Sequence, residues 1–375
     1  MLMKSLLVGN GINIQYGSSR CSNKEIVKRV ITSPDDPDFP LDAITLTDRH
    51  QAVWLIGSLY SEIPNIIRGD FDKYYLASFE ETALTSFKER YSTFEQQPSP
   101  LNVGLEDYFF VLELFFKKNN VHNPDAHAIR ETFKRIFSYS IYDSGYLESL
   151  HLRYPRKLKS FLDPFDEIFT TNYDSNLDVF SERRVVHLHG CFKTLSYLYD
   201  ENSFRNQLGD NQLDAAFFDP EKAYLFSNVI FSYSGSLKEF QMKQATRTNA
   251  ALEKFVDGYK NRADVRKEVA AWQEDESRIM RNLASSIAKK AANPSLKFEE
   301  YYGAERLQSI SDTLAIVGLS PNNDTHIFDF LKSNDKLRYI TYYYHSQGDI
   351  DSVRKLLPKD GLSFADVRSL WGKYE

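Results

Sequence analysis

Two short segments of the chain carry side chains that are suited to catalysis. Residues 170–174 (Thr-Thr-Asn-Tyr-Asp) place an amide and a carboxylate at alternate positions, and residues 187–190 (His-Leu-His-Gly) place two imidazoles in the same way. An amide and a carboxylate can bind a ribose and a carboxamide through hydrogen bonds. An imidazole can accept a proton from a sugar hydroxyl near neutral pH. The alternative is that Asn172 or Asp174 caps the following helix and that each histidine is structural.

Two glycine-containing segments could contact phosphate groups. They are residues 9–13 (Gly-Asn-Gly-Ile-Asn) and residues 318–324 (Gly-Leu-Ser-Pro-Asn-Asn-Asp). Glycine lets backbone amides approach an anion, and the start of a helix adds favourable partial charge. Neither the dinucleotide fingerprint nor the Walker motif is complete, because Ile14 stands where a third glycine is expected and no Walker lysine follows. Plain turns between a strand and a helix are the alternative for both segments.

The cysteine count limits the choice of metal sites. Cys21 and Cys191 are the only cysteines, which excludes a disulfide framework and a four-thiolate zinc site. His187 and His189 would share one face if their strand extended that far, but no carboxylate or thiol lies at a matching local spacing. We therefore expect no metal ion.

Each of the four segments directly follows a predicted strand. Apolar and β-branched runs predict strands at residues 6–8, 165–171, 185–188, 223–233, 313–317 and 337–344, and helical periodicity predicts helices at 12–16, 174–180 and 325–331. Strands that alternate with helices favour a parallel sheet, and such sheets bind ligands at the carboxyl ends of their strands. The shared position of the four segments is therefore the main indication of a site.

Two long helical stretches interrupt the alternating pattern. Helical periodicity dominates from about residue 48 to residue 162, after a loop rich in proline and acidic residues, and residues 237–292 are helical and heavily charged. We predict an α/β core at residues 1–40 and 163–375, which includes the charged segment 237–292, with a helical insertion at 41–162. The charged segment could form an oligomer interface, or it could be a solvated helical face.

The composition excludes several classes of protein. The chain has 375 residues with 46 lysines and arginines against 52 acidic residues, a net charge of −6, so we expect no direct binding to nucleic acid. The strongest apolar run, residues 108–116, is too short to span a membrane. The first residues lack the features of a signal peptide, so we expect a cytoplasmic protein.

Taken in order, the four segments resemble those of the sirtuin family. That family has a glycine-rich opening, an asparagine-to-aspartate segment, a His-Gly segment and a Gly-x-Ser segment, and the gap of 17 residues from Asn172 to His189 adds specificity. The resemblance covers residues 4–17, 165–191 and 314–344. It implies a Rossmann-like parallel sheet that binds NAD, with a large helical insertion and additional C-terminal helices in this chain.

The resemblance also implies roles for individual residues. Asn172 and His189 would be the catalytic pair, with His189 as the base that acts on the ribose hydroxyls. Asp174 would hold the carboxamide of the nicotinamide, and His187 lies outside the family's motif. The residues implied in NAD binding are Gly9, Asn10, Gly11, Asn13, Thr171, Asp174, Gly318 and Ser320.

The departures from the family favour one activity over another. Sirtuin deacylases carry a four-cysteine zinc module after the His-Gly segment, and this chain has only Cys191 there. The long helical insertion instead looks like that of the sirtuin-like NADases of bacterial anti-phage defence, which cleave NAD+ to nicotinamide and ADP-ribose. Several of those enzymes are oligomers, and some are paired with a HerA-type ATPase.

We therefore expect an NAD+ glycohydrolase with NAD+ as substrate, no zinc and no further cofactor. A homo-oligomer and a HerA-type ATPase partner are implied in the same way. Two alternatives stay open. One is a non-catalytic sensor that binds NAD or ADP-ribose and controls a partner, and the other is a zinc-free deacylase or ADP-ribosyl transferase that uses NAD.

Overall fold

The protein is built on one parallel β-sheet. The computed structural model describes residues 2–74, 76–96, 98–200, 203, 205–206, 218–233, 235–297 and 300–375. Over these residues the sheet has six strands in the order β3-β2-β1-β4-β5-β6, and all neighbouring strands are parallel. The strands are β1 (Lys4–Val8), β2 (Glu167–Thr170), β3 (Val186–His187), β4 (Asp312–Val317), β5 (Leu337–Tyr344) and β6 (Leu362–Asp366).

The strand order has a switch point between β1 and β4. The chain runs from β1 outward through β2 to β3, and then returns to the other side of β1 and continues from β4 to β6. The order is that of the Rossmann fold, in which ligands bind where the direction of winding reverses. The predicted Rossmann-like parallel sheet is therefore confirmed.

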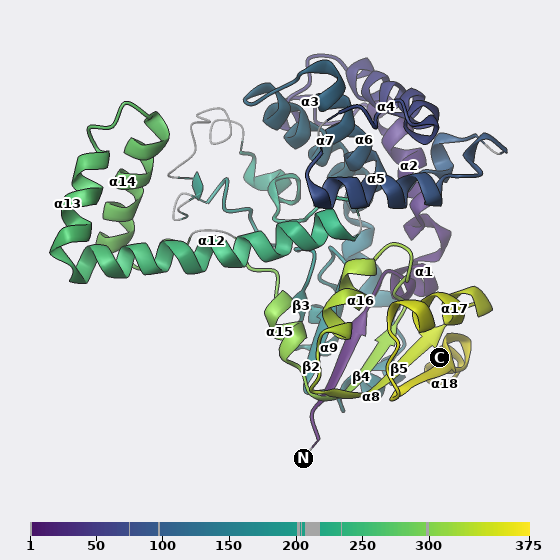
Figure 1. Cartoon of the computed structure of the whole chain (residues 1–375). Helices are drawn as coiled ribbons and strands as arrows, with labels where there is room; N and C mark the ends of the chain where they lie inside the picture. Colours follow the sequence, from purple (N-terminus) through teal and green to yellow (C-terminus); the bar gives the residue numbers. More distant parts are fainter. Residues whose placement is uncertain are drawn as a thin grey trace.

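Eight α-helices lie between β1 and β2 in the described chain: α1 (Gly11–Gly17), α2 (Asn23–Thr32), α3 (Leu41–Ile44), α4 (His50–Arg68), α5 (Ser78–Arg90), α6 (Asp107–Asn119), α7 (Asp125–Tyr142) and α8 (Lys159–Leu162). Helices α2 to α7, here called the helical layer, face the carboxyl ends of the strands (Figure 1). Aromatic side chains fill its interior, where the rings of Phe109, Phe133 and Phe137 lie 4.8 to 5.2 Å apart. Such burial of large apolar side chains is the main source of stability in this part of the chain.

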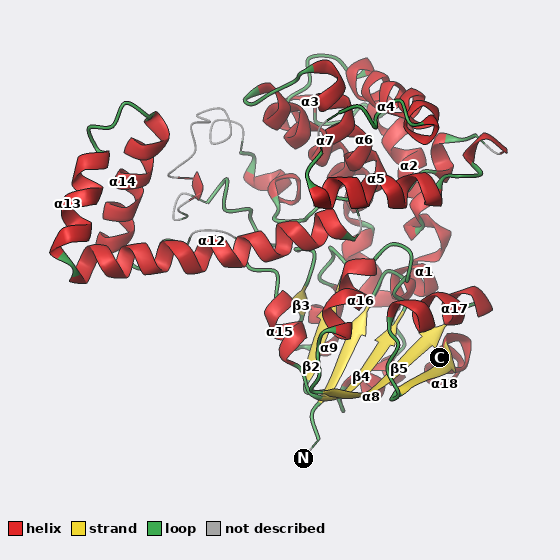
Figure 2. Ribbon diagram, viewed as in Figure 1, coloured by secondary structure: helices red, strands yellow, loops and turns green. Residues whose placement is uncertain are grey.

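The remaining α-helices flank the sheet or leave it (Figure 2). They are α9 (Asn176–Ser181), α12 (Ser236–Asn261), α13 (Ala263–Trp272), α14 (Arg278–Ala292), α15 (Ala304–Ser309), α16 (Thr325–Lys332), α17 (Gln347–Leu356) and α18 (Val367–Tyr374). Helices α12 to α14 form an arm that extends away from the sheet and the helical layer (Figure 1). Val256, Val269, Ala284 and Ile287 form a small buried cluster that holds the three helices together.

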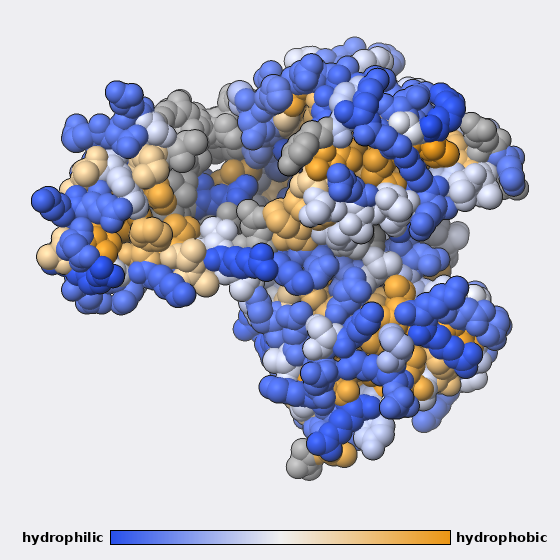
Figure 3. Space-filling model, viewed as in Figure 1, coloured by the Kyte–Doolittle hydropathy of each residue, from blue (hydrophilic) through white to orange (hydrophobic). Residues whose placement is uncertain are grey.

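Short 3-10 helices connect these elements. Their bounds are Ser18–Cys21, Ser33–Asp35, Phe94–Gln96, Pro100–Asn102, Asp143–Gly145, Leu147–Arg153, Arg156–Leu158 and Pro220–Phe226. Polar residues cover much of the visible surface, with apolar residues gathered over parts of the helical layer and the arm (Figure 3). None of the described helices has both the length and the apolar character that a membrane span needs.

Two expectations about single elements need correction, and one strand was missed. The prediction of a strand at residues 223–233 is wrong, because a 3-10 helix that begins at Pro220, with Asp219 as its N-cap, runs into this segment. The aromatic side chains of the segment pack against the helical layer. The strand β3 ends at His187, so the alternation of side chains does not continue to His189. Strand β6 was not predicted. The domain boundaries at residues 40/41 and 162/163 stay a prediction.

Glycines bring the ends of β1 and β4 into direct backbone contact. The amides of Gly9 and Gly11 donate to the carbonyl oxygens of Val317 and Gly318 at 2.9 and 2.8 Å. A Cβ atom on Gly9 would lie 2.5 Å from the Gly318 oxygen, and one on Gly11 would lie 2.5 Å from the Gly318 Cα. Gly318 itself has a φ of +67°, which favours glycine. The close approach of two backbones explains why glycine is needed here.

A matched pair of glycine substitutions tests this contact. We expect Gly9→Ala to lower the free energy of unfolding by about 1–3 kcal/mol, because the added methyl group meets backbone atoms that cannot rotate away. Gly57→Ala is the control, since nothing lies within 4 Å of its added Cβ in α4, and alanine there should stabilise the helix by up to about 1 kcal/mol. Urea denaturation measures both changes, and equal effects would contradict the contact.

Candidate active site

A cavity of about 640 Å³ lies between the carboxyl ends of the strands and the helical layer. Its volume is typical of small-molecule and cofactor sites. The predicted site residues that line it are Asn10, Gly11, Asn13, Thr171, Asn172, Asp174, His189, Gly318 and Ser320. Gly9 does not line the cavity, and its amide serves the contact with β4 instead of an anion. The four segments singled out in the sequence therefore meet at one cavity.

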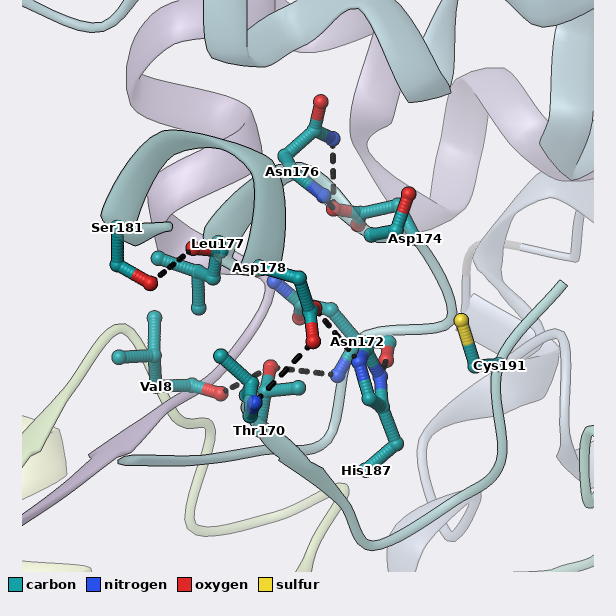
Figure 4. Close-up of polar contacts among 12 residues, drawn as sticks. Val8, Thr170, Asn172, Asp174, Asn176, Leu177, Asp178, Ser181, His187 and Cys191 are labelled. Carbon is teal, nitrogen blue, oxygen red and sulfur yellow. Dashed lines mark hydrogen bonds and ion pairs between the residues drawn. The ribbon is translucent and has the colours of Figure 1, made fainter. Parts of the chain in front are cut away.

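Asn172 is held by its backbone, while its side-chain amide is unused. Its backbone amide donates to the hydroxyl of Thr170 at 3.0 Å, and that hydroxyl donates to the carbonyl oxygen of Val8 at 2.9 Å. The carbonyl oxygen of Asn172 lies 3.1 Å from Nδ1 of His187 (Figure 4). Among the described residues, the buried Nδ2 atom of Asn172 has no hydrogen-bond partner. A buried donor without a partner costs about 1–3 kcal/mol, and a ligand in the cavity can supply the missing acceptor.

His187 positions Asn172 and does not line the cavity. Its Nε2 atom lies 2.9 Å from Oδ2 of Asp178, and its Nδ1 faces the carbonyl oxygen of Asn172 (Figure 4). Both partners are acceptors, so both contacts are satisfied when the ring carries two protons. Burial alone would lower the pKa of His187, but the hydrogen bond and charge of Asp178 and the Asn172 carbonyl raise it above its usual value.

Asp174 stabilises the start of the next helix, which is the structural role that the sequence left open. Its Oδ1 accepts hydrogen bonds from the backbone amide and Nδ2 of Asn176, the first residue of α9, at 3.1 and 2.6 Å. Its Oδ2 accepts from Nδ2 of Asn13 at 2.7 Å. Burial raises the pKa of Asp174, and these hydrogen bonds act in the opposite direction. Asp174 thus organises the start of α9 and the position of Asn13.

His189 is paired with a second histidine. Its Nε2 lies 2.8 Å from Nε2 of His326 in α16, and the two rings are stacked. Burial lowers the pKa of both rings well below the usual value, and the charge of Lys238 adds to this effect. Both rings are therefore neutral near pH 7, and one donates its proton to the other.

Charged residues from three separate segments surround this histidine pair. Lys238, in the first turn of α12, is fully buried and pairs with Oε1 of Glu106. The hydroxyl of Tyr173 donates to the same oxygen at 2.6 Å. Asp324, at the start of α16, has Oδ1 3.9 Å from Nε2 of His189. The segment 318–324 pointed to Asp324, but no sequence signal linked Lys238 or Glu106 to the site, since each lies in a long helical region.

Two arginines add positive charge to the wall beside α1. Arg20 and Arg29 line the cavity together with Asn10. Arg20 pairs with Asp143, and Nε of Arg29 donates to the carbonyl oxygen of Ser140 at 2.8 Å. Guanidinium groups suit phosphate recognition because their donors match two phosphate oxygens. Sequence reasoning placed phosphate binding on the glycines and did not include these arginines.

One group of described side chains is close enough to share a metal ion, namely His189, Asp324 and His326. Two nitrogen ligands on a tetrahedral Zn²⁺ would lie about 3.3 Å apart. The two Nε2 atoms are closer than that and at a normal hydrogen-bond distance. The ammonium group of Lys238 nearby also disfavours a cation. His187 and His189 do not share a site, because His187 contacts Asp178 and His189 contacts His326.

Comparisons with known proteins give no further assignment. No family model, curated protein or solved structure matches the chain. The resemblance to sirtuins therefore stays a prediction that rests on the four segments themselves.

The two-proton state of His187 predicts a pH-dependent contribution to stability. Because its pKa is raised on folding, the contribution is present below the unfolded pKa of about 6.5 and is lost as the pH rises through the folded value. We expect the free energy of unfolding of wild type to exceed that of His187→Gln by more at pH 6 than at pH 8.5. Urea denaturation at both pH values measures this difference. An unchanged difference would contradict the two-proton state, and the exposed His50→Gln serves as control.

Proposed function

We propose that the cavity binds NAD+ and that the protein hydrolyses the bond between nicotinamide and ribose. The observation that carries this proposal is the unused amide of Asn172, which is buried, held by its backbone and lines the same cavity as His189. A ribose hydroxyl would supply the acceptor that this amide lacks. The predicted catalytic pair thus consists of one side chain with an unused donor and one neutral imidazole.

The chemistry requires little more than these groups and water. Loss of nicotinamide develops positive charge on the ribose, and dipoles that are fixed before the reaction stabilise such charge best. Thr170 and His187 hold the backbone of Asn172, and its side-chain amide would orient the ribose through a hydrogen bond to a hydroxyl. Enclosure by the helical layer limits bulk water, which strengthens these interactions.

The rest of the cavity is compatible with the remainder of NAD+. The backbone around Gly11 and Gly318 and the arginines Arg20 and Arg29 would face the phosphates. Ser320 would contact the nucleotide, as the resemblance implies. Asn13, held by Asp174, would contact the nicotinamide side of the substrate. In this arrangement Asp174 acts on the carboxamide directly or through Asn13.

The proposal extends to the biological setting that the resemblance implies. NAD+ hydrolysis would deplete the cytoplasm of an infected cell as an anti-phage response. Such an enzyme needs control, which an oligomer or a HerA-type ATPase partner would supply. The arm of α12 to α14 is the segment that extends from the body, and its first turn contains Lys238, whose charge acts on the histidine pair. Contacts made by the arm could therefore influence the site.

Substitution of Asn172 tests the proposed activity. We expect wild type, alone or with an activating partner, to release nicotinamide from NAD+, and Asn172→Ala to be slower by about 100-fold or more because a preorganised donor is lost. Asn119→Ala, at an exposed position of α6, is the matched control and should keep full activity. Chromatographic assay of nicotinamide measures the rates, and circular dichroism confirms that each variant is folded.

Other results of these assays would favour the sensor, or the deacylase or transferase, over the hydrolase. Binding of NAD+ in calorimetry without any release of nicotinamide would favour the sensor. Product formation that depends on an acylated peptide or a protein acceptor would favour the deacylase or transferase. Equal nicotinamide release by wild type and Asn172→Ala would contradict the proposed role of the amide.

A further inference from the structure

Asp324 is an acidic residue of the cavity wall that the predicted catalytic pair does not use. It occupies the position before the first turn of α16, where an aspartate usually accepts a hydrogen bond from a backbone amide of the helix. Its side chain makes no such cap hydrogen bond. The carboxylate instead lines the cavity, with Oδ1 3.9 Å from Nε2 of His189. A water or a ribose hydroxyl in the cavity can reach this carboxylate.

His189 itself has no free nitrogen with which to accept a proton. Its Nε2 is occupied by His326, and a further hydrogen bond joins the ring to the backbone of Thr171. The hydrogen bond to Thr171 favours the protonated form of the His189 ring, as expected when a ring N–H donates to a backbone carbonyl. Nε2 of His189 therefore carries no proton and accepts the hydrogen bond from Nε2–H of His326. The imidazole of His189 therefore forms a fixed, neutral part of the cavity wall. Nδ1 of His326 has no partner among the described residues, but His326 does not line the cavity, so Asp324 is the neighbouring group that can take a proton there.

Burial and the charged groups around Asp324 together set its pKa near neutral pH. They are His189 and His326 in the histidine pair, Lys238 of α12, Glu106 before α6, Tyr173 after β2 and Tyr342 of β5. Burial raises the pKa of Asp324 to about 7, the charge of Lys238 opposes this rise, and the charge of Glu106 adds to it. A base with this property suits proton transfer at neutral pH.

We propose that the carboxylate of Asp324 is the base that takes a proton from the water that attacks the ribose, and that His326 is a positioning residue that fixes His189 beside it. This inference rests on the proposed hydrolysis of NAD+. The water oxygen bonds to the anomeric carbon, the bond from that carbon to the pyridinium nitrogen breaks, and the electron pair returns to the nitrogen to give neutral nicotinamide. The proton passes to Asp324 and then to solvent, so one proton is released per turnover.

The pH dependence of nicotinamide release tests the inference. We expect the wild-type rate to rise with pH and to level off above a midpoint near 7, because the ionised carboxylate is the active form. Asp324→Asn should lower the rate by about 100-fold or more and should lose the rise with pH. Calorimetry should show that it still binds NAD+. Asp329→Asn, on the exposed side of the same helix, is the matched control and should keep the wild-type profile.

Two further variants should move the midpoint in opposite directions. Lys238→Met removes a charge that lowers the pKa of Asp324, so the midpoint should shift to higher pH. Glu106→Gln removes a charge that raises it, so the midpoint should shift to lower pH. Lys243→Met, one turn further along α12 and partly exposed, should leave the midpoint unchanged. These shifts test the inference even if Asp324→Asn fails to fold.

The outcomes distinguish this inference from the proposed function. A wild-type pH profile in Asp324→Asn, or shifts of the same sign in both charge variants, would overturn the inference and leave NAD+ hydrolysis in place. Loss of activity with a chelator and its return with a divalent cation would also overturn it, in favour of a metal site. Absence of nicotinamide release from every wild-type preparation would overturn both proposals.

Discussion

The site depends on the backbone contact between the ends of β1 and β4. Gly9, Gly11 and Gly318 allow two strands to meet with no side chain between them. Because the sheet reverses its direction of winding at this contact, the loops after neighbouring strands diverge and leave room for a ligand. On the other side of β1, its pairing with β2 sets where β2 ends, and so the position of Asn172. A loss of close approach here would alter every wall of the cavity.

The helical layer closes the other side of the cavity and changes its electrostatics. Glu106 before α6 and Lys238 of α12 are brought together above the sheet, where burial makes an unpaired charge very costly. Their pairing makes the wall nearly neutral. The charges of both residues still affect the pKa of Asp324, whereas of the two only Lys238 affects the pKa values of the histidine pair. The helices between β1 and β2 therefore supply functional groups as well as a cover. The arm shares in this arrangement because Lys238 lies in its first turn.

Local sequence pattern predicted the parts of the structure that local interactions determine. The strands β1 to β5 of the central sheet were identified because apolar runs and glycine turns are properties of adjacent residues. The pairing of His189 with His326 and of Lys238 with Glu106 joins residues more than 130 positions apart. No local pattern encodes such contacts. The aromatic segment at 223–233 shows the same limit, since its residues pack on helices and its composition alone is that of a strand.

The segment 170–174 shows how structural and functional polar residues can be told apart. The sequence allowed either Asn172 or Asp174 to cap the following helix. Ser175 is the N-cap residue of α9, and Asp174 just before it accepts a hydrogen bond from the backbone amide of Asn176, with both carboxylate oxygens hydrogen-bonded inside the protein. Asn172 is also buried but keeps a donor without a partner among the described residues. A fold tolerates such a destabilising group when another constraint holds it in place, and here Thr170 and His187 provide that constraint through the backbone. The difference in hydrogen-bond satisfaction, which the sequence cannot display, therefore separates the two residues: Asp174 is bonded within the protein through both oxygens, whereas Asn172 keeps a donor that the proposed ligand would need.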